Sequence, residues 1–355
     1  MRELTSHARI PFAITILTIV GAWVLGGPAT GLVVALLAVL EISISFDNAI
    51  VNATVLKKMT PRWQQIFVTW GILIAVFGMR LIFPILIVAV ASGLGFTEVI
   101  DQAINHPELY AENLKEANPV IASFGGTFLL MVCLGYFLDP DKDAHWVGPV
   151  ERGLGGLGRV DSIVPAIAGA TVLLVSQLVD SAQETEVLIA GLAGMVIYLF
   201  VSGIAARLEP DDDDEDDEGV ERISGSAGKA AVQIAGKAGL ASFLYLELLD
   251  ASFSFDGVIG AFAISKDIFV IAAGLGLGAI YIRTLTVYLV RQGTLAEYRY
   301  LENGAHWAIG ALAILLFVGI EHHTPEVVTG LIGAGVIIVA LWSSIRANRR
   351  EAAIA

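Results

Sequence analysis

Ten stretches of apolar residues follow one another along the chain, each long enough, or nearly so, to cross a bilayer. A membrane-spanning helix needs about 20 such residues. The stretches lie roughly at 11–27, 29–55, 64–92, 119–138, 160–179, 184–205, 239–264, 268–290, 305–320 and 326–345. This pattern predicts an all-α polytopic membrane protein with about ten transmembrane helices. The first stretch also resembles the apolar core of a signal peptide, but it lacks a convincing cleavage site and we expect a retained span.

Two of the stretches carry acids in the same arrangement. The first contains Glu41-Ile-Ser-Ile-Ser-Phe-Asp47-Asn48, and the second contains Asp250-Ala-Ser-Phe-Ser-Phe-Asp256-Gly257. In each motif the acids are six residues apart and enclose two serines, which are Ser43, Ser45, Ser252 and Ser254. Carboxylates inside a membrane are costly, so their presence indicates a functional site. The alternative is an accidental match between two short patterns.

The spacing within each motif bears on the shape of the helix. Residues six positions apart lie about 120° apart around an ideal helix, so the two acids would converge if the helix is interrupted between them. Serine and asparagine side chains can bond the freed backbone groups, and Gly257 tolerates irregular dihedrals. Irregular backbone at membrane depth is tolerated where it lines a cavity. We therefore expect a break in both motifs.

The distribution of lysine and arginine predicts how the chain is oriented. These residues concentrate in cytoplasmic loops. With both termini inside, only Lys115 and Lys266 fall in outer loops, and Arg80 and Arg283 fall within spans. The two acid motifs then run in opposite directions, and each is followed by a span that carries one of these arginines. We interpret this as an inverted-topology repeat, in which the site lies near the midplane between the halves.

The same pattern divides the chain into six parts. They are an N-terminal span at 1–28, a first repeat half at 29–139, a two-span insertion at 140–208, an acidic cytoplasmic linker at 209–238, a second repeat half at 239–346 and a cytoplasmic tail at 347–355. The linker contains an unbroken acidic run from Asp211 to Glu218, which accounts for much of the net charge of −14. We interpret the run as a solvated linker. The alternative is an antenna that attracts cations.

The chemistry offered by the two motifs is that of oxygen ligands. Neither contains histidine or cysteine, and Glu247 lies one turn before Asp250 as a further acid. Carboxylate, amide and hydroxyl oxygens suit Mn²⁺, Mg²⁺ or Ca²⁺ and argue against Cu(I) and Zn²⁺. The four paired acids with Arg80 and Arg283 leave a formal charge of −2, which one divalent cation would neutralise. Desolvated acids hold protons, which an entering cation would expel, so proton coupling is a hypothesis.

These motifs resemble the TerC-type family of bacterial integral membrane proteins (tellurium-resistance C, Alx-like). A longer bacterial branch of that family is similar at further segments, namely Phe124-Gly-Gly-Thr-Phe-Leu-Leu-Met131, Lys142-Asp-Ala-His-Trp146 and Pro325-Glu-Val-Val-Thr-Gly-Leu-Ile-Gly333. The resemblance covers roughly residues 30–350. Two features depart from the family pattern: Gly257 stands where a polar residue often follows the second Asp, and the fifth and sixth spans form an insertion.

The resemblance implies efflux of metal ions, manganese above all, from the bacterial inner (plasma) membrane, with an older association with tellurite resistance. Carried over residue by residue, the metal ligands would be Glu41, Asp47, Asn48, Asp250 and Asp256. The serines at 43, 45, 252 and 254 would support them, with Arg80 and Arg283 as charge partners. The divalent cation is then a substrate, Mn²⁺ first and Ca²⁺ or Mg²⁺ as alternatives, and we expect no prosthetic group.

An enzyme, a membrane scaffold and an exporter of another solute are the alternatives to cation transport. Paired intramembrane aspartates also occur in aspartyl intramembrane proteases, but those need a Gly-x-Gly-Asp context, whereas here the second acid of each motif follows Ser-Phe. No Gly-x-Ser-x-Gly motif, His-Glu-x-x-His motif or phosphate-binding loop occurs either. We therefore expect no enzyme. A membrane scaffold would use the acids only for salt bridges, although buried ion pairs stabilise weakly. An exporter of another small solute is a further alternative. The expected partners are the lipid bilayer and the cation, not nucleic acid, and the sequence does not fix an oligomeric state.

Overall fold

The computed structural model describes residues 2–140, 142, 144–158, 160, 162–208, 220–222, 232–234, 236–322 and 325–354. These residues are helical apart from turns and two short antiparallel strands, β1 (Val220–Arg222) and β2 (Val232–Ile234). The helical membrane-protein fold predicted from the sequence is confirmed. The acidic run at 211–218 lies outside the described residues, so its predicted role stays a prediction.

The helices follow the predicted stretches closely. Their bounds are α1 (Arg2–Gly26), α2 (Pro28–Ile44), α3 (Phe46–Leu56), α4 (Pro61–Leu73), the π-helix η1 (Ile74–Ile82), α5 (Phe83–Ser92), α6 (Phe96–Asn105), α7 (Pro107–Glu116), α8 (Asn118–Phe137), α9 (Gly148–Leu157), α10 (Ile163–Ser176), α11 (Glu184–Leu208), α12 (Gly236–Ile264), α13 (Ile268–Arg291), α14 (Thr294–Glu297), α15 (Leu301–Glu321) and α16 (Glu326–Ile354).

Within the described residues, eight helices are long and apolar enough to cross a membrane, and the bent pair of α2 and α3 makes up to nine. The fifth predicted stretch, at 160–179, is helical only over the 14 residues of α10. Its helix begins late because Ser162 takes a left-handed conformation (φ 65°) directly before it. The count is therefore eight or nine spans with one shorter apolar helix, rather than ten equal ones.

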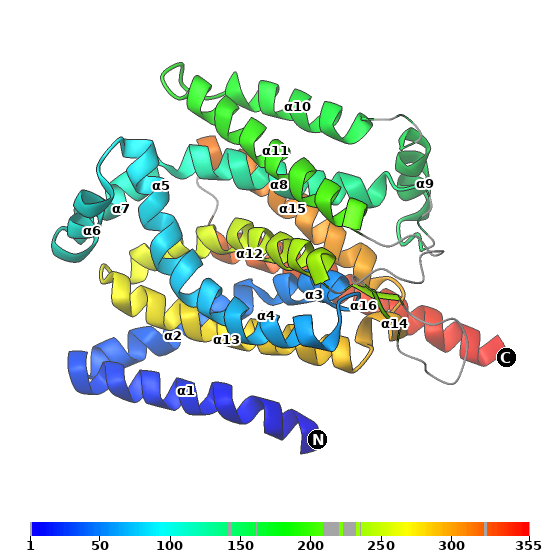
Figure 1. Ribbon diagram of the computed structural model, residues 1–355, viewed down its shortest axis with the longest axis horizontal. Helices are drawn as coiled ribbons and strands as arrows, with labels where there is room; N and C mark the ends of the chain where they lie inside the picture. Colours follow the sequence, from blue (N-terminus) through cyan, green and yellow to red (C-terminus); the bar gives the residue numbers. More distant parts are fainter. Residues whose placement is uncertain are drawn as a thin grey trace.

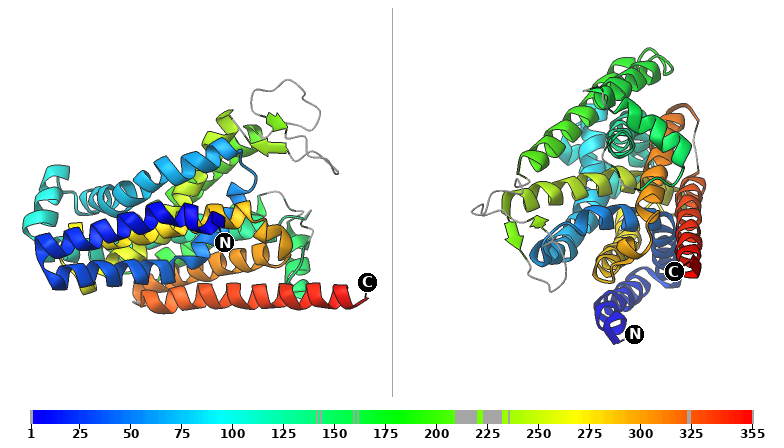
Figure 2. Two further views of the ribbon diagram at one scale, coloured as in Figure 1. Left: turned by 90° about the horizontal axis from the view of Figure 1, so that it is seen from below. Right: turned by 90° about the vertical axis from the view of Figure 1, so that its right-hand side faces the viewer.

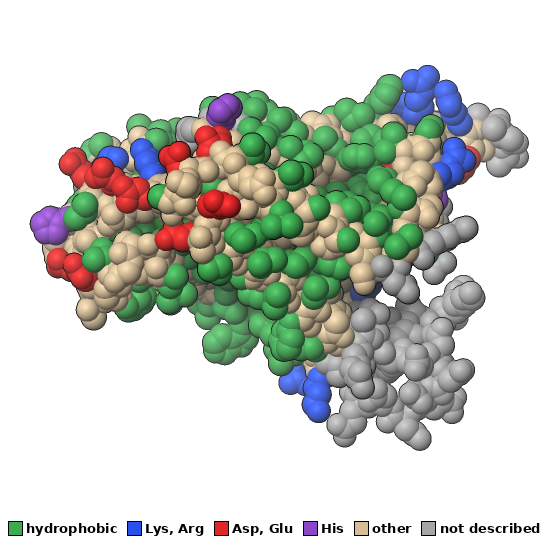
Figure 3. Space-filling view, turned by 90° about the horizontal axis from the view of Figure 1, so that it is seen from above, with side chains coloured by type: hydrophobic (Ala, Val, Ile, Leu, Met, Phe, Trp, Pro, Cys, Tyr) green, Lys and Arg blue, Asp and Glu red, His purple; other side chains and the backbone are tan. Residues whose placement is uncertain are grey.

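The long helices run side by side, and α6 and α7 lie at one end of the bundle (Figure 1). The chain-terminal ends of α1 and α16 both point away from that end (Figures 1 and 2). Acidic side chains gather at the α6 and α7 end, and lysine and arginine gather at the opposite end (Figure 3). The centre of the bundle is built by α13, which packs against α2, α3, α4 and η1, and by α12, which contacts α3, η1 and α8.

The predicted helix break occurs in the first motif. The chain turns at Ser45 (φ −90°, ψ 16°), where α2 ends and α3 begins at a bend of 55°. The predicted break in the second motif is wrong, because α12 is continuous from Gly236–Ile264. The Ser252 hydroxyl donates to the Leu248 carbonyl within that helix (2.9 Å) rather than to a freed backbone group. Gly257 serves close packing instead, since an added Cβ would lie 3.1 Å from Glu41 Oε2.

The span that carries Arg80 has an irregularity that the sequence analysis did not predict. Residues Ile74–Ile82 form a π-helix, η1, and the Phe83 N–H donates to the Gly78 carbonyl five residues back. Pro84 follows at once, and proline has no N–H and clashes with the carbonyl four positions earlier. Widening the preceding turn avoids that clash. Such π segments often occur at functional sites, and this one directs Arg80 into the bundle, where it is 2% exposed.

Candidate metal-ion site

Two arginines pair with three acids in the centre of the bundle, and a fourth acid, Asp47, is next in the chain to Asn48, which bonds one of the three. Arg283 on α13 is 1% exposed and binds Glu247 through two hydrogen bonds, from Nη1 to Oε1 (2.7 Å) and from Nη2 to Oε2 (2.9 Å). Its Nη2 also donates to Asp250 Oδ2 (2.9 Å). The guanidinium lies 4.5 Å from the centre of the Phe67 ring. Gly71 leaves room for this arrangement, because a Cβ there would overlap Arg283 Nη1.

The second arginine makes the corresponding contact in the first motif. Arg80 Nη2 pairs with Glu41 Oε1, and Arg80 Nη1 donates to the Ala75 carbonyl (2.6 Å). Ser45 Oγ, at the helix break, donates to the same Glu41 oxygen (3.2 Å). The first acid of each motif is thus bound to the arginine of the following span, as Glu41 to Arg80 and Asp250 to Arg283.

Asn48 connects the two motifs. Its Nδ2 donates to Asp250 Oδ1 (2.8 Å), so residues 202 positions apart meet at the point where α3 passes α12. The Asn48 Oδ1 atom is buried and has no hydrogen-bond partner within the described residues. The same holds for both amide atoms of Asn52, one turn further along α3, and for Ser254 Oγ on α12. Unpaired buried polar atoms are costly, so a group of them beside carboxylates is unusual for a purely structural core.

Asp47 differs from the other acids of the cluster. It is 6% exposed, accepts the Asn48 backbone N–H (2.9 Å) and forms no ion pair within the described residues. Gly333 of α16 packs directly against it, so closely that a Cβ would overlap Asp47 Oδ2. Asp47 also lines a cavity of about 20 Å³ whose other lining residues are Ile44, Ser45, Phe253, Leu312, Thr329 and Gly330. A cavity of that size holds roughly one water molecule.

The remaining predicted residues fall into three groups. Ser45, Ser252 and Ser254 are buried beside the cluster. Ser43 is exposed, and its hydroxyl donates to the Val39 carbonyl of its own helix (2.7 Å), so it lies away from the site. The side chain of Asp256 lies outside the described residues, and its predicted role as a ligand stays a prediction.

The arrangement does not form a ready metal site. Among the described residues, no group of three or more His, Cys, Asp or Glu side chains is placed to hold a metal ion. These acids cannot gather around a metal ion here, because Glu41, Glu247 and Asp250 are already paired with the two arginines. The four described acids and two arginines still leave a formal charge of −2. Binding a divalent cation here would require at least one arginine to release its carboxylate.

The structure adds residues that the sequence analysis did not assign to the site. Glu247 is the principal partner of Arg283, and its spacing from Asp250 had already placed both acids on one face. Asn52 could have been found from its position one turn after Asn48. Gly333 could not, because its role depends on how α16 packs against α3.

A further buried acid, Glu151 on α9, lies outside the candidate membrane-spanning segments and is 0% exposed. Its Oε1 accepts the Val147 N–H (3.0 Å) and Trp307 Nε1 (3.1 Å). Its Oε2 accepts from the donors Lys142 Nζ (2.7 Å), Asn303 Nδ2 (2.9 Å) and the Trp146 N–H (3.2 Å). Burial alone would raise the pKa of Glu151, but these hydrogen bonds outweigh burial and hold its pKa below the ordinary value. Glu151 therefore fastens the segment before α9 to α15.

A comparison with protein families gives a match over residues 46–351 to the family described as "Protein of unknown function (DUF475)". The chain belongs to this family. The matched region contains Asp47, the second acid motif and both buried arginines, while Glu41 precedes it.

The curated proteins include a similar sequence, the "Uncharacterized membrane protein YceF" of Bacillus subtilis (strain 168). It is 34% identical over 84 residues, which are 23% of this chain and 32% of that protein. The match therefore spans about a third of the relative's length. No solved structure matches the chain. Together with the apolar helices, these findings establish a multi-pass membrane protein of the DUF475 family.

Proposed function

We propose that this protein transports a divalent cation across the membrane, with Mn²⁺ as the first candidate substrate and efflux as the direction. The observation that carries the proposal is Asp47, a buried carboxylate at a helix break that has no cationic partner within the described residues. Irregular backbone inside a membrane is tolerated where it lines a cavity, and Asp47 faces one. Besides Asp47, the lining of that cavity offers the hydroxyl-bearing side chains of Ser45 and Thr329, and oxygen donors of this kind suit Mn²⁺, Mg²⁺ or Ca²⁺.

The ion pairs supply a mechanism for alternation. In this conformation Arg80 and Arg283 form ion pairs with three acids. A cation entering beside Asp47 would compete with the arginines for Glu41 and Asp250, and Asn48 Oδ1 and Asn52 would offer further oxygens. When the cation leaves, the arginines return to the acids. Protons displaced from desolvated acids would give coupling to a pH gradient.

Two further parts of the proposal concern architecture. The matched contacts of Glu41 with Arg80 and of Asp250 with Arg283 support an inverted repeat. The TerC-type resemblance of the same motifs supports metal-ion efflux in the bacterial inner membrane. The gathering of lysine and arginine at the end away from α6 and α7 supports cytoplasmic termini. On this proposal the protein is no enzyme and carries no prosthetic group.

A membrane scaffold is the second candidate function, because the hydrogen bonds of Arg283 to Glu247 and Asp250 would also hold α13 against α12. Binding of Mn²⁺ to the purified protein, followed by the electron paramagnetic resonance signal of free Mn²⁺, separates the two functions. Asp47→Asn should weaken binding at least about tenfold, since carboxylate charge sets affinity in oxygen sites, while the protein stays folded. Ser43→Ala is the matched control. Loss of folding in Asp47→Asn, or unchanged Mn²⁺ binding, would contradict the transport proposal.

A further inference from the structure

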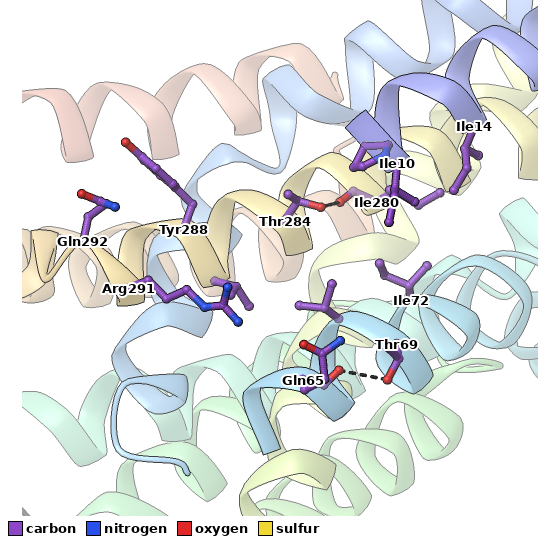
Figure 4. A pocket seen from close by; sticks show the side chains of 13 residues that line it. Ile10, Ile14, Gln65, Thr69, Ile72, Ile280, Thr284, Tyr288, Arg291 and Gln292 are labelled. Atoms are coloured by element: carbon purple, nitrogen blue, oxygen red, sulfur yellow. Dashed lines mark hydrogen bonds between the residues drawn. The ribbon is translucent and has the colours of Figure 1, made fainter. Parts of the chain in front are cut away.

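A groove of about 350 Å³ lies between α1, α4 and α13, away from the acid cluster. Figure 4 shows its lining residues, which lie at positions 10–14 of α1, at 65–72 of α4 and at 280–292 in and directly after the second half of α13. The hydroxyl of Thr15 on α1 donates to the Tyr281 hydroxyl on α13 (3.1 Å), which holds α1 against the bundle beside this groove. Each of these helices forms all or part of a segment that is long and apolar enough to cross a membrane, so we expect the groove to open within the bilayer.

The lining of the groove is amphipathic along its length. Its apolar part is formed by isoleucine and valine side chains, which are Ile10, Ile14, Val68, Ile72, Ile280 and Val287. Its polar residues Gln65, Tyr288, Arg291 and Gln292 lie nearer the ends of their helices, while the hydroxyl-bearing Thr69 and Thr284 lie among the apolar side chains. In Figure 4 the Arg291 guanidinium points into the space between α13 and α4, toward Gln65. None of the lining residues is acidic.

Each of the three helices carries an arginine that lines the groove or lies within three residues of a lining residue. Arg9 directly precedes the lining residue Ile10, Arg62 lies three residues before Gln65 on α4, and Arg291 lines the groove itself. The end of the bundle where these helix ends lie is the basic one. Cytoplasmic leaflets are rich in anionic lipids, and basic pockets between transmembrane helices on that side bind phospholipid head groups. Arginine is suited to phosphate because its planar guanidinium donates two parallel hydrogen bonds.

We propose that the groove between α1, α4 and α13 binds one anionic phospholipid of the surrounding leaflet. The phosphate lies at Arg291, with Arg9 and Arg62 adding positive charge at the mouth, and one acyl chain lies along Ile14, Ile72 and Ile280. This site is separate from the cation site and does not depend on cation transport. The bound lipid fills the space between α1 and α4.

Native mass spectrometry of the full chain tests the proposal. The protein is released from detergent micelles containing equal amounts of phosphatidylglycerol and phosphatidylcholine, and lipid adducts are counted for each variant. Arg291→Gln should reduce the phosphatidylglycerol adduct about fivefold, the value of one basic residue near an anionic surface. Thr284→Phe, which fills the groove from α13, should reduce adducts of both lipids. Arg349→Gln is the matched control, because Arg349 is exposed at the same end on α16.

Each outcome either supports or overturns the proposed lipid site. Selective loss of phosphatidylglycerol in Arg291→Gln, with Arg349→Gln unchanged, supports the site. Equal retention of the two lipids by the wild type overturns the preference for an anionic head group. If no variant changes the number of lipid adducts, the adducts are ordinary boundary lipid, and the groove is not a binding site. Monodisperse elution of each variant before the measurement excludes loss of folding as the cause.

Discussion

Replacing Glu151 by glutamine would test how the segment before α9 is held against α15. The substitution keeps the shape of the side chain but turns one of its two oxygens into an amide nitrogen. The least costly orientation places the nitrogen at Oε1, where two donors, the Val147 N–H and Trp307 Nε1, lose their acceptor. A hydrogen bond to a charged group contributes about 1.5–3 kcal/mol. The local free energy of opening should therefore fall by roughly 3–6 kcal/mol.

Hydrogen–deuterium exchange of peptides covering residues 142–158 measures this loss directly. Because each 1.4 kcal/mol is a factor of ten, amides in that segment should exchange roughly 100 to 10,000 times faster in Glu151→Gln, while those in α12 and α13 keep their wild-type rates. Arg152→Gln is the matched control, since Arg152 is exposed and bonds only the Gly148 carbonyl of its own helix in the described contacts. Unchanged exchange in Glu151→Gln would refute the idea that this carboxylate fastens the segment.

The same contact predicts a pH dependence. The pKa of Glu151 is lower in the folded protein than its ordinary value of 4.5. A carboxylate with a depressed pKa contributes stability above its ordinary pKa and loses it as pH falls through the folded value. Protection of residues 142–158 should therefore be constant from neutral pH down to the ordinary value and should decline only below it. A decline that begins near neutral pH would contradict this assignment.

Three further substitutions test the cluster. Arg283→Met leaves two buried carboxylates without their cation and should lower the free energy of unfolding by about 3–5 kcal/mol. Unfolding in detergent measures this change, and an unchanged free energy would mean that Arg283 does not pair with Glu247 and Asp250. Gly333→Ala should displace the Asp47 carboxylate and weaken Mn²⁺ binding, while Gly335→Ala, which has open space beside it, should not. Asn52→Leu removes a buried amide that has no hydrogen-bond partner in the described part of the chain. It should stabilise the protein by about 1–3 kcal/mol while it lowers transport; a loss of stability would show that the amide has a structural partner.

The apolar pattern predicted most of the helices because burial in lipid imposes a length and a composition on each span. The acid spacing and the polar residues of the first motif predicted the break that occurs at Ser45. The same reasoning predicted a break in the second motif, but α12 is continuous there. The difference lies in packing. Gly257 lies against Glu41 in a regular helix, and nothing in the local sequence distinguishes a glycine for close packing from a glycine for a bend.

The sequence predicted which residues belong to the candidate site better than it predicted which of them contact one another. Matching motifs indicated that Glu41, Asp250 and the arginines belong together, because unpaired charges inside a membrane are costly. The sequence could not show that Glu247 takes two of the hydrogen bonds of Arg283, or that Asp47 forms no ion pair with any residue that the structure describes. Those facts depend on how helices far apart in the chain cross each other. Asn48 and Asp250, for example, meet only because α3 and α12 pass in the bundle.

The measurement that tests the central claim most directly is Mn²⁺ flux into proteoliposomes loaded with a fluorescent indicator. Wild type and Asp47→Asn are compared with and without an imposed pH gradient, with Ser43→Ala as control and Ca²⁺ and Mg²⁺ as competing substrates. The account predicts flux in the wild type and the control, its acceleration by the gradient, and its loss in Asp47→Asn. Absence of flux from folded wild-type protein, or equal flux in Asp47→Asn, would contradict the claim that this cluster carries a cation across the membrane.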